Sequence, residues 1–392
     1  MTTVVPSQAE LSGQASALVP LLQANASWTE ENRRLHDKSV EAMADAGIFK
    51  LRTPARYGGY ECDARTVVAV VSELARGDGS ASWNAAVWSI ATWMAGLFPD
   101  AAQDEVFASP DARVCGTLSP SAMAVRKNGG VVLNGKWGFI SGALHSHWQI
   151  TVAMAVNPDG SHEPIMALVP MSDLEVVDDW YTSGLSGTGS VTTIANEVYV
   201  PAERTLSMGM ALHEQYASER NSGAPIYRSP MLPTASASSI GTALGLAKAA
   251  RDLFFERLPD RGITYTSYAS QREAPVTHLQ VADASLKIDA AEFHIDRLAT
   301  LVDAKGHSGE PWTIEERVRA RVDMARACQL ARDAVETFSG ASGASSLYRG
   351  VAMQRIERDI RAISMHALMH PTTNLELYGR ILCGLEPNTL YV

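Results

Sequence analysis

The chain has 392 residues, of which 46% are hydrophobic and only 19% are charged, and its formal net charge is −10. This length allows two or three structural units, because single hydrophobic cores stop growing near about 250–300 residues. The low charged fraction favours a large buried interior or an oligomer that hides part of its surface. The acidic balance argues against a nucleic-acid partner, which would need a basic stripe. Basic residues are concentrated at residues 316–326, where positive and negative charges alternate. This pattern indicates a solvated helix face.

The four cysteines, Cys62, Cys115, Cys328 and Cys383, lie far apart and form no CxxC pair. A zinc site or a disulfide framework is therefore not expected, and a reducing cytoplasm fits. The N-terminal segment has no positive region followed by an apolar run, and no stretch approaches the about 20 apolar residues that cross a bilayer. We expect a soluble, cytoplasmic protein without a membrane partner.

The first part of the chain reads as helical. Ser27–Glu30 has the spacing of a capping box and predicts a helix that runs to about Ala46. Helical periodicity returns over 64–75 and 81–98. We expect residues 1–111 to form an N-terminal helical domain.

The middle part changes to short β-rich runs separated by turn signals. Asn134-Gly135 lies between two apolar runs and predicts a β-hairpin. We expect residues 112–231 to hold a central antiparallel β-sandwich or barrel domain and the loop that follows it.

Long helical patterns return in the last part. The runs that begin at Ala237, Thr277, Thr313 and Leu347 are each more than 20 residues long. They predict a four-helix up-down bundle over residues 232–392. The fold class expected from the whole chain is therefore α+β.

The run SGLSGTGSVTT (183–193) is rich in serine and glycine but fits no nucleotide-binding template. It lacks the Lys-Ser/Thr of a P-loop, and Thr192 stands where the dinucleotide fingerprint needs glycine. Thr188 likewise replaces the last glycine of a hydrolase elbow. Two readings remain: a flexible β-turn, or a loop whose backbone N–H groups and hydroxyls approach a planar ligand.

Two histidine pairs are candidates for chemistry. His145 and His147 would share one face of a strand, but no third ligand has a recognisable spacing, so hydrogen-bonded histidines at a strand start are favoured over a metal site. His366 and His370 lie four apart in a helical pattern, and Pro371 predicts that His370 marks the helix end. His366 is read either as a buried, hydrogen-bonded histidine or as an acid/base group that faces a cofactor.

Several segments, in this order and spacing, resemble the acyl-CoA dehydrogenase superfamily. They are GIFKLRTPARYGGYECD, ELARGDGSASWNAAV, NGKWGFISGA, GLSGTGSVTTIANEVYVPAE and GASGASSLYRGVAMQRIERDIRAISMHA. The resemblance covers essentially the whole chain. It implies an N-terminal helical domain, a sheet domain and a C-terminal bundle.

Within this superfamily the chain resembles the flavin-dependent monooxygenase branch, the two-component hydroxylases. Many dehydrogenases carry a catalytic Tyr-Glu shortly after an Arg-Asp pair, whereas this chain has His366-Ala367 after Arg358-Asp359. The branch's Trp-x-Phe-x-Ser-Gly motif is matched by residues 137–142. Some dehydrogenases place the glutamate on another helix, so a relocated base remains an alternative.

The resemblance implies a reduced flavin, FMN or FAD, supplied by a separate reductase, and O2 that is carried as a flavin C4a-hydroperoxide. It implies hydroxylation of an aromatic or polycyclic small molecule, with N- or S-oxygenation as the alternative. A flavin-free scaffold of the same fold is a third reading. The superfamily usually forms homotetramers, which suits the low charged fraction.

The resemblance also implies roles for individual residues. Ser141 would bond near flavin N5, and His366, with His370 as the alternative, would sit by C4a. The flavin would be held by Trp137, Phe139, Ser141, Gly142, Thr188, Gly189 and Ser190.

The substrate wall is expected from Trp88, Ala91, Trp93 and Met94. Many of the hydroxylases have a His-x-Trp contact to a phenolic substrate, where this chain has Ala91-Thr92-Trp93. This departure counts against a simple phenol as the substrate and favours the alternative, N- or S-oxygenation.

Overall fold

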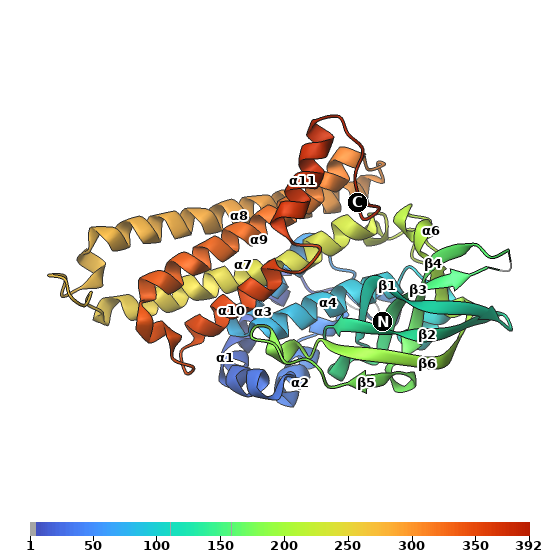
Figure 1. Ribbon diagram of the computed structural model, residues 1–392, viewed down its shortest axis with the longest axis horizontal. Coiled ribbons are helices and arrows are strands. Elements are labelled where there is room, and N and C mark those ends of the chain that lie inside the picture. The colour runs from blue at the N-terminus through green and yellow to red at the C-terminus, as the bar shows by residue number, and fades with distance from the viewer. Residues whose placement is uncertain (1–4, 110, 158) are drawn as a thin grey trace.

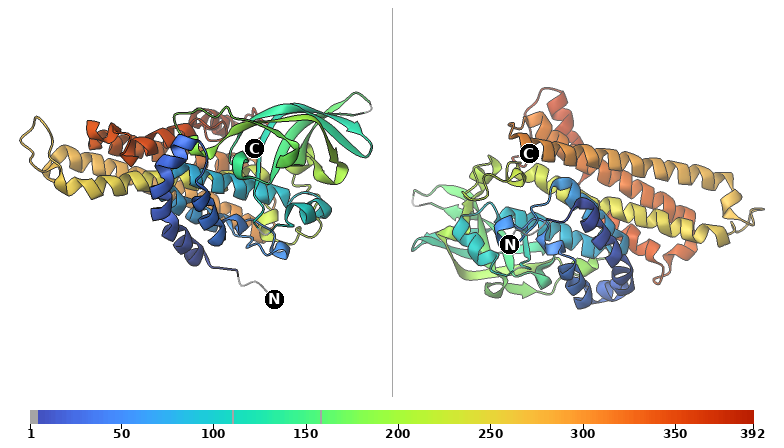
Figure 2. Two further views of the ribbon diagram at one scale, coloured as in Figure 1. Left: turned by 90° about the horizontal axis from the view of Figure 1, so that it is seen from below. Right: turned by 180° about the vertical axis from the view of Figure 1, so that it is seen from behind.

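The computed structural model describes residues 5–109, 111–157 and 159–392. The first four residues of the expected N-terminal domain lie outside this description. Long helices run side by side at one end of the molecule, and a sheet forms the other end (Figure 1). The views in Figure 2 show the N-terminal helices packed along both parts. The expected helix–sheet–helix fold class is confirmed.

The N-terminal helices begin and end differently from the expectation. They are α1 (Gln8–Asn32), α2 (Asp37–Asp45), α3 (Ala64–Gly77), α4 (Gly79–Ala95) and α5 (Asp100–Val106). The capping box that opens α1 is formed by Ser7 and Glu10, so the predicted start at Ser27 is wrong. Ser27 and Glu30 lie inside α1, because a Ser-x-x-Glu spacing also fits one face of a helix interior.

The central strands form one mixed sheet. They are β1 (Val114–Lys127), β2 (Gly130–Ile140), β3 (Trp148–Val156), β4 (His162–Pro170), β5 (Glu175–Val177), β6 (Val191–Pro201) and β7 (Thr205–Ser207). Their order is β5-β6-β2-β1-β3-β4-β7. Pairing is antiparallel except between β1 and β3, which run parallel, where antiparallel pairing throughout was expected.

The predicted hairpin at Asn134-Gly135 is wrong, because both residues lie inside β2. β1 and β2 are instead joined at Asn128 and Gly129. Gly135 pairs with Ala122, and a Cβ on Gly135 would stand 2.2 Å from that of Ala122. The dipeptide therefore serves close strand packing at a register shift between β2 and β6 and does not form a turn.

The C-terminal part contains three of the four long helices that were expected. After the short α6 (Met208–Leu212) come α7 (Met231–Arg257), α8 (Pro275–Ser308), α9 (Ile314–Ser342), α10 (Ala352–Ser364) and α11 (Pro371–Leu382). The fourth predicted helix stops early, because α10 ends at Ser364 and a turn leads into α11. The side chain of Asn374 stabilises this turn by donating to the carbonyls of Leu368 and His370, both at 2.9 Å.

One hydrophobic core joins the two helical parts. Ala64, Val68 and Trp83 from the N-terminal helices belong to the same buried cluster as Ile240 of α7 and Phe338 of α9. The domain boundaries expected after residues 111 and 231 mark changes of element type and stay a prediction. The shared core fixes α4 between the sheet and the bundle. None of the helices in the described part is long and apolar enough to cross a membrane.

Candidate active site

A cavity of about 690 Å³ lies where α4, the sheet and the helices α7, α9 and α11 meet. Its walls are mostly apolar. α4 contributes one helix face at a spacing of three to four residues, namely Trp83, Val87, Ile90, Ala91 and Met94. An apolar cavity with a few polar groups is the usual form of a small-molecule site.

Ser141 brings a hydroxyl to the cavity wall and begins a buried chain of hydrogen bonds. The indole N–H of Trp83 donates to Ser141 Oγ at 3.1 Å, and Ser141 Oγ lies 2.7 Å from Ser190 Oγ. Ser190 Oγ is 2.7 Å from Thr188 Oγ1, which donates to the Leu185 carbonyl at 2.7 Å. The position of this hydroxyl is therefore fixed by its neighbours, as a reactive site requires.

The backbone around Ser141 turns sharply at the end of β2. Phe139 and Gly142 have φ values of 61° and 75°, in the left-handed region. Glycine is required at 142 for a second reason, since a Cβ there would lie 2.5 Å from Trp88 Nε1. The Ser-Gly pair of the sequence motif thus turns the chain and presents the hydroxyl.

His366 reaches the cavity from the turn between α10 and α11. Its ring contacts Trp83 edge-on, with the ring centroids 5.4 Å apart. The imidazole is open to the cavity but enclosed by protein, and this burial lowers its pKa, so the neutral form prevails near neutral pH. The Leu368 N–H donates to Nδ1 at 3.3 Å, which places the ring proton on Nε2.

A buried carboxyl group anchors the loop behind Ser141. The Leu185 N–H donates to Asp359 Oδ1 at 2.7 Å, and Leu185 itself has φ 52°. Burial and the nearby Asp78 carboxylate raise the pKa of Asp359 to about 7. Asp78 caps α4 by accepting from the Ala81 N–H at 2.7 Å. The two carboxyl groups thus hold the start of α4 and the loop that contains Thr188 and Ser190.

The structure brings part of the predicted flavin site to the cavity. Phe139, Ser141 and His366 line it. Ser190 is connected to it only through its hydrogen bond to Ser141, and Thr188 only through its hydrogen bond to Ser190; Gly189 lies between them with φ 53°. His370 is not among the lining residues and caps the start of α11.

Trp137 is also absent from the described lining, because its indole is fully buried and donates to the Val152 carbonyl at 2.9 Å. Of the predicted substrate wall, Ala91 and Met94 line the cavity, whereas Trp88 and Trp93 do not. Trp88 bonds to Ser146 Oγ and Trp93 to the Ile226 carbonyl, at 2.9 and 2.7 Å. Helical spacing from Met94 back to Trp83 would have selected the correct face of α4.

His145 and His147 lie just before β3, outside the cavity lining. His147 Nδ1 accepts from the Arg113 N–H at 3.1 Å. Burial and the cations Arg34 and Arg113 lower the pKa of His145 to about 4. No group of three or more candidate metal ligands occurs among the described residues.

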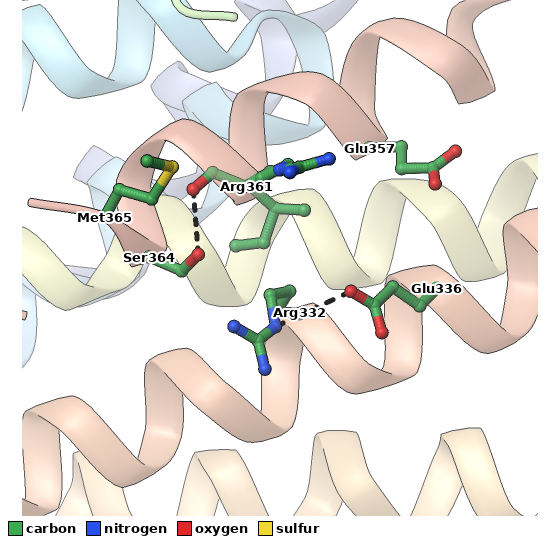
Figure 3. A pocket seen from close by; sticks show the side chains of 7 residues that line it. Arg332, Glu336, Glu357, Arg361, Ser364 and Met365 are labelled. Atoms are coloured by element: carbon green, nitrogen blue, oxygen red, sulfur yellow. Dashed lines mark hydrogen bonds and ion pairs between the residues drawn. The ribbon is translucent and has the colours of Figure 1, made fainter. Parts of the chain in front are cut away.

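A second cavity, of about 520 Å³, lies between α9 and α10. Figure 3 shows Arg332 and Glu336 on one helix facing Arg361 and Glu357 on the other. Arg332 Nε is 3.7 Å from Glu336 Oε1, and Glu357 Oε2 accepts from Ser339 Oγ at 2.6 Å. Because Arg332, Glu336 and Glu357 already have partners, the first cavity is the better candidate active site.

Comparison with known proteins places the chain in a family. Models of the acyl-CoA dehydrogenase N-terminal and C-terminal domains match residues 18–110 and 238–371. The structure of XiaF from Streptomyces sp., in complex with FADH2 and glycerol, is similar with a TM-score of 0.92 and 32% identity over 97% of each chain. The chain belongs to the acyl-CoA dehydrogenase superfamily.

Two curated relatives indicate the branch of the superfamily to which the chain belongs. The flavin-dependent monooxygenase oxygenase subunit HsaA of Rhodococcus jostii (strain RHA1) is 31% identical over 94% of this chain and 97% of its own length. The oxygenase component of an FADH2-dependent resorcinol hydroxylase from Rhizobium sp. is 28% identical over 97% of this chain and 96% of its own length. The protein is thus a flavin-dependent monooxygenase of the oxygenase-component type. The expected enzyme class and the expected cofactor, a reduced flavin, are confirmed.

Proposed function

We propose that this oxygenase component hydroxylates a carbon atom of an aromatic or polycyclic substrate, with reduced flavin delivered by a separate flavin reductase. The observation that carries the proposal is the meeting of Ser141 and His366 at Trp83, inside a mostly apolar cavity. The activity of the Rhizobium relative, a resorcinol hydroxylase, supports an aromatic substrate.

The residues present fit a flavin ring. The cavity volume of about 690 Å³ leaves room for a tricyclic ring and a substrate beside it. Phe139 is 77% exposed although it lines the cavity, and a flat ligand would cover this apolar surface. Ser141 and Phe139 would hold the ring, with Thr188 and Ser190 supporting the Ser141 hydroxyl. When bound, a reduced flavin supplies the electrons that activate O2 and the route by which one oxygen atom reaches the substrate.

The chain's own residues then have distinct tasks. Neutral His366 holds a proton at Nε2 and can donate it as a hydrogen bond into the cavity. Ser141 supplies a hydroxyl whose direction is set by Trp83 and Ser190. The apolar residues of α4 and the sheet exclude water, which protects a reactive oxygen species from release as hydrogen peroxide. Ala91 leaves space for the substrate where a larger side chain would fill it.

We further propose a homotetramer and a cytoplasmic location. Leu279, Leu286 and Phe293 are 73%, 67% and 64% exposed and recur every seven residues along α8, so they form one apolar stripe. A stripe of this kind is typical of a helix that packs against another subunit. The four cysteines are free thiols, which suits the reducing compartment in which flavin reductases would supply the cofactor.

The test mixes the protein and reduced flavin with O2 and a panel of aromatic and polycyclic compounds. We expect the bound flavin to be reoxidised more slowly than free flavin. We also expect one atom of isotopically labelled O2 to be found in the product, bonded to a carbon atom. Reoxidation at the free rate without label incorporation would contradict the proposal. Label found on nitrogen or sulfur would favour the alternative oxygenation. Dye reduction by an acyl-CoA without a reductase would favour a dehydrogenase, for which Glu376 is the cavity carboxylate.

A further inference from the structure

Arg321 of α9 is the one arginine or lysine among the described residues that line the active-site cavity. Its side chain is largely buried, with the residue only 7% exposed. The alternating charges of residues 316–326 predicted a solvated helix face, and this is wrong at Arg321, which points into the protein. Apolar residues such as Leu232 and Leu377 line the same cavity.

The guanidinium of Arg321 lacks a countercharge in the described structure. Nη1 donates to the backbone carbonyl of Tyr391, and Nε is buried without a partner. Its neighbours on α9 differ, since Arg317 pairs with Glu214 and Arg319 with Asp323. Among the described residues, no carboxylate forms an ion pair with Arg321, so one buried cation faces the cavity with donors to spare.

A buried charge without a partner is costly, because desolvation is not repaid by a nearby opposite charge. Burial accordingly lowers the pKa of Arg321. A planar guanidinium with unused donors matches a carboxylate better than any neutral group, since two parallel N–H···O bonds can form. Arg321 thus has the chemistry of an anion-binding residue inside a site whose walls are mostly apolar.

We propose that Arg321 pairs with a carboxylate, or a like anion, of the substrate, so that the oxygenase acts on aromatic acids. This inference rests on the proposed function, because it names the substrate class of that site. Glu376 is the other charged side chain in the described lining, but it is exposed and accepts from Asn388 Nδ2 at 3.2 Å. The buried Arg321 cation is therefore the main charge inside the cavity.

The experiment measures binding by calorimetry, without O2, using three arylacetates (phenyl-, 1-naphthyl- and indole-3-acetate) and their neutral amides as probes. We expect the wild type to bind at least one acid at least about tenfold more tightly than its amide. Arg321→Gln keeps a donor for the Tyr391 carbonyl but removes the charge, so it should abolish the acid preference and leave the amide affinity unchanged. Arg321→Lys should retain much of the preference, and Glu376→Gln should not reduce it.

Three outcomes would overturn the inference. Equal affinity of the wild type for acids and amides would show that the protein does not recognise the charge of the carboxylate. Equal weakening of acid and amide in Arg321→Gln would show that Arg321 only anchors the C-terminal segment. A loss of FMN affinity with unchanged riboflavin affinity, and no change for the acids, would assign Arg321 to the flavin phosphate. Should Arg321→Gln not fold, the wild type and Arg321→Lys decide alone. Failure of the proposed function is distinguished by the labelled-oxygen experiment, which does not depend on acid preference.

Discussion

Trp83 donates its indole N–H to Ser141 Oγ across 3.1 Å, and the same ring meets His366 edge-on at 5.4 Å. Residues far apart in the sequence are therefore arranged around one side chain of α4. Because α4 also packs into the shared hydrophobic core, its position is fixed by the whole fold. Trp83 acts as a positioning residue that sets the direction of the Ser141 hydroxyl.

Trp83→Phe should keep the apolar contact and remove the hydrogen bond. We expect Ser141 to lose its fixed direction, so that hydroxylation falls about three- to tenfold and more hydrogen peroxide is released per flavin oxidised. The ratio of product to peroxide measures this. The matched control is Trp88→Phe, because Trp88 bonds to Ser146 outside the cavity lining. An unchanged ratio in Trp83→Phe would mean that the indole N–H has no part in the reaction.

His366→Ala should lower hydroxylation by roughly ten- to a hundredfold, since a proton donor in the cavity is lost. Burial lowers the pKa of His366, so the neutral ring should persist through neutral pH and be protonated only below its ordinary value. We expect the wild-type rate to be flat above about pH 6.5 and to fall in acid, and the acid limb to disappear in the variant. His370→Ala is the control. If His370→Ala lowered the hydroxylation rate and His366→Ala did not, the proton donor would be His370.

Part of the site could be read from the sequence because its signals are local. The Trp-x-Phe-x-Ser-Gly motif identified Ser141, and the histidine after Arg358-Asp359 identified His366. The same motif misled at Trp137, because regular alternation would place residues 137, 139 and 141 on one face of the strand. The register shift between Trp137 and Ile140, with Phe139 at φ 61°, breaks this alternation, and the indole enters the core. Arg321 could not be found, since its environment is created by the turn after α10 and by residues 388–391, and a helix rich in arginine gives no sign of which one is buried.

The fold was likewise predictable where its signals are local and was not predictable where it depends on distant residues. Long periodic helices were located, but their ends were not. The long predicted run that begins at Leu347 concealed the end of α10 at Ser364, because the Asn374 side chain that stabilises the following turn lies beyond the helix. The parallel pairing of β1 with β3 depends on long-range packing that no local turn signal encodes.

Asp359→Asn should stabilise the protein at higher pH. The pKa of Asp359 is raised to about 7, so the wild type loses stability as the pH rises from the unfolded pKa of an aspartate through that value. Asparagine cannot ionise and keeps the acceptor for the Leu185 N–H. The free energy of unfolding of the variant relative to the wild type should therefore rise between about pH 5 and about pH 8, by on the order of 1–3 kcal/mol. Denaturant titrations at both values measure it, with the exposed Asp289→Asn as control. A constant difference across this range would show that Asp359 is ionised throughout.

Leu286→Lys with Phe293→Lys tests the α8 stripe as a subunit contact. Both side chains are more than 60% exposed in the single chain, at 67% and 64%, so the charges should cost little in an isolated subunit. In an assembled oligomer the same lysines would be buried against apolar surface without a partner, and the assembly should dissociate. Light scattering coupled to size exclusion measures the mass. Val125→Lys is the matched control, because Val125 is 54% exposed on β1, away from α8. We expect the control to keep the wild-type mass and the double variant to fall to smaller species with a similar helical content. A double variant with the wild-type oligomeric mass would exclude this face of α8 from the interface.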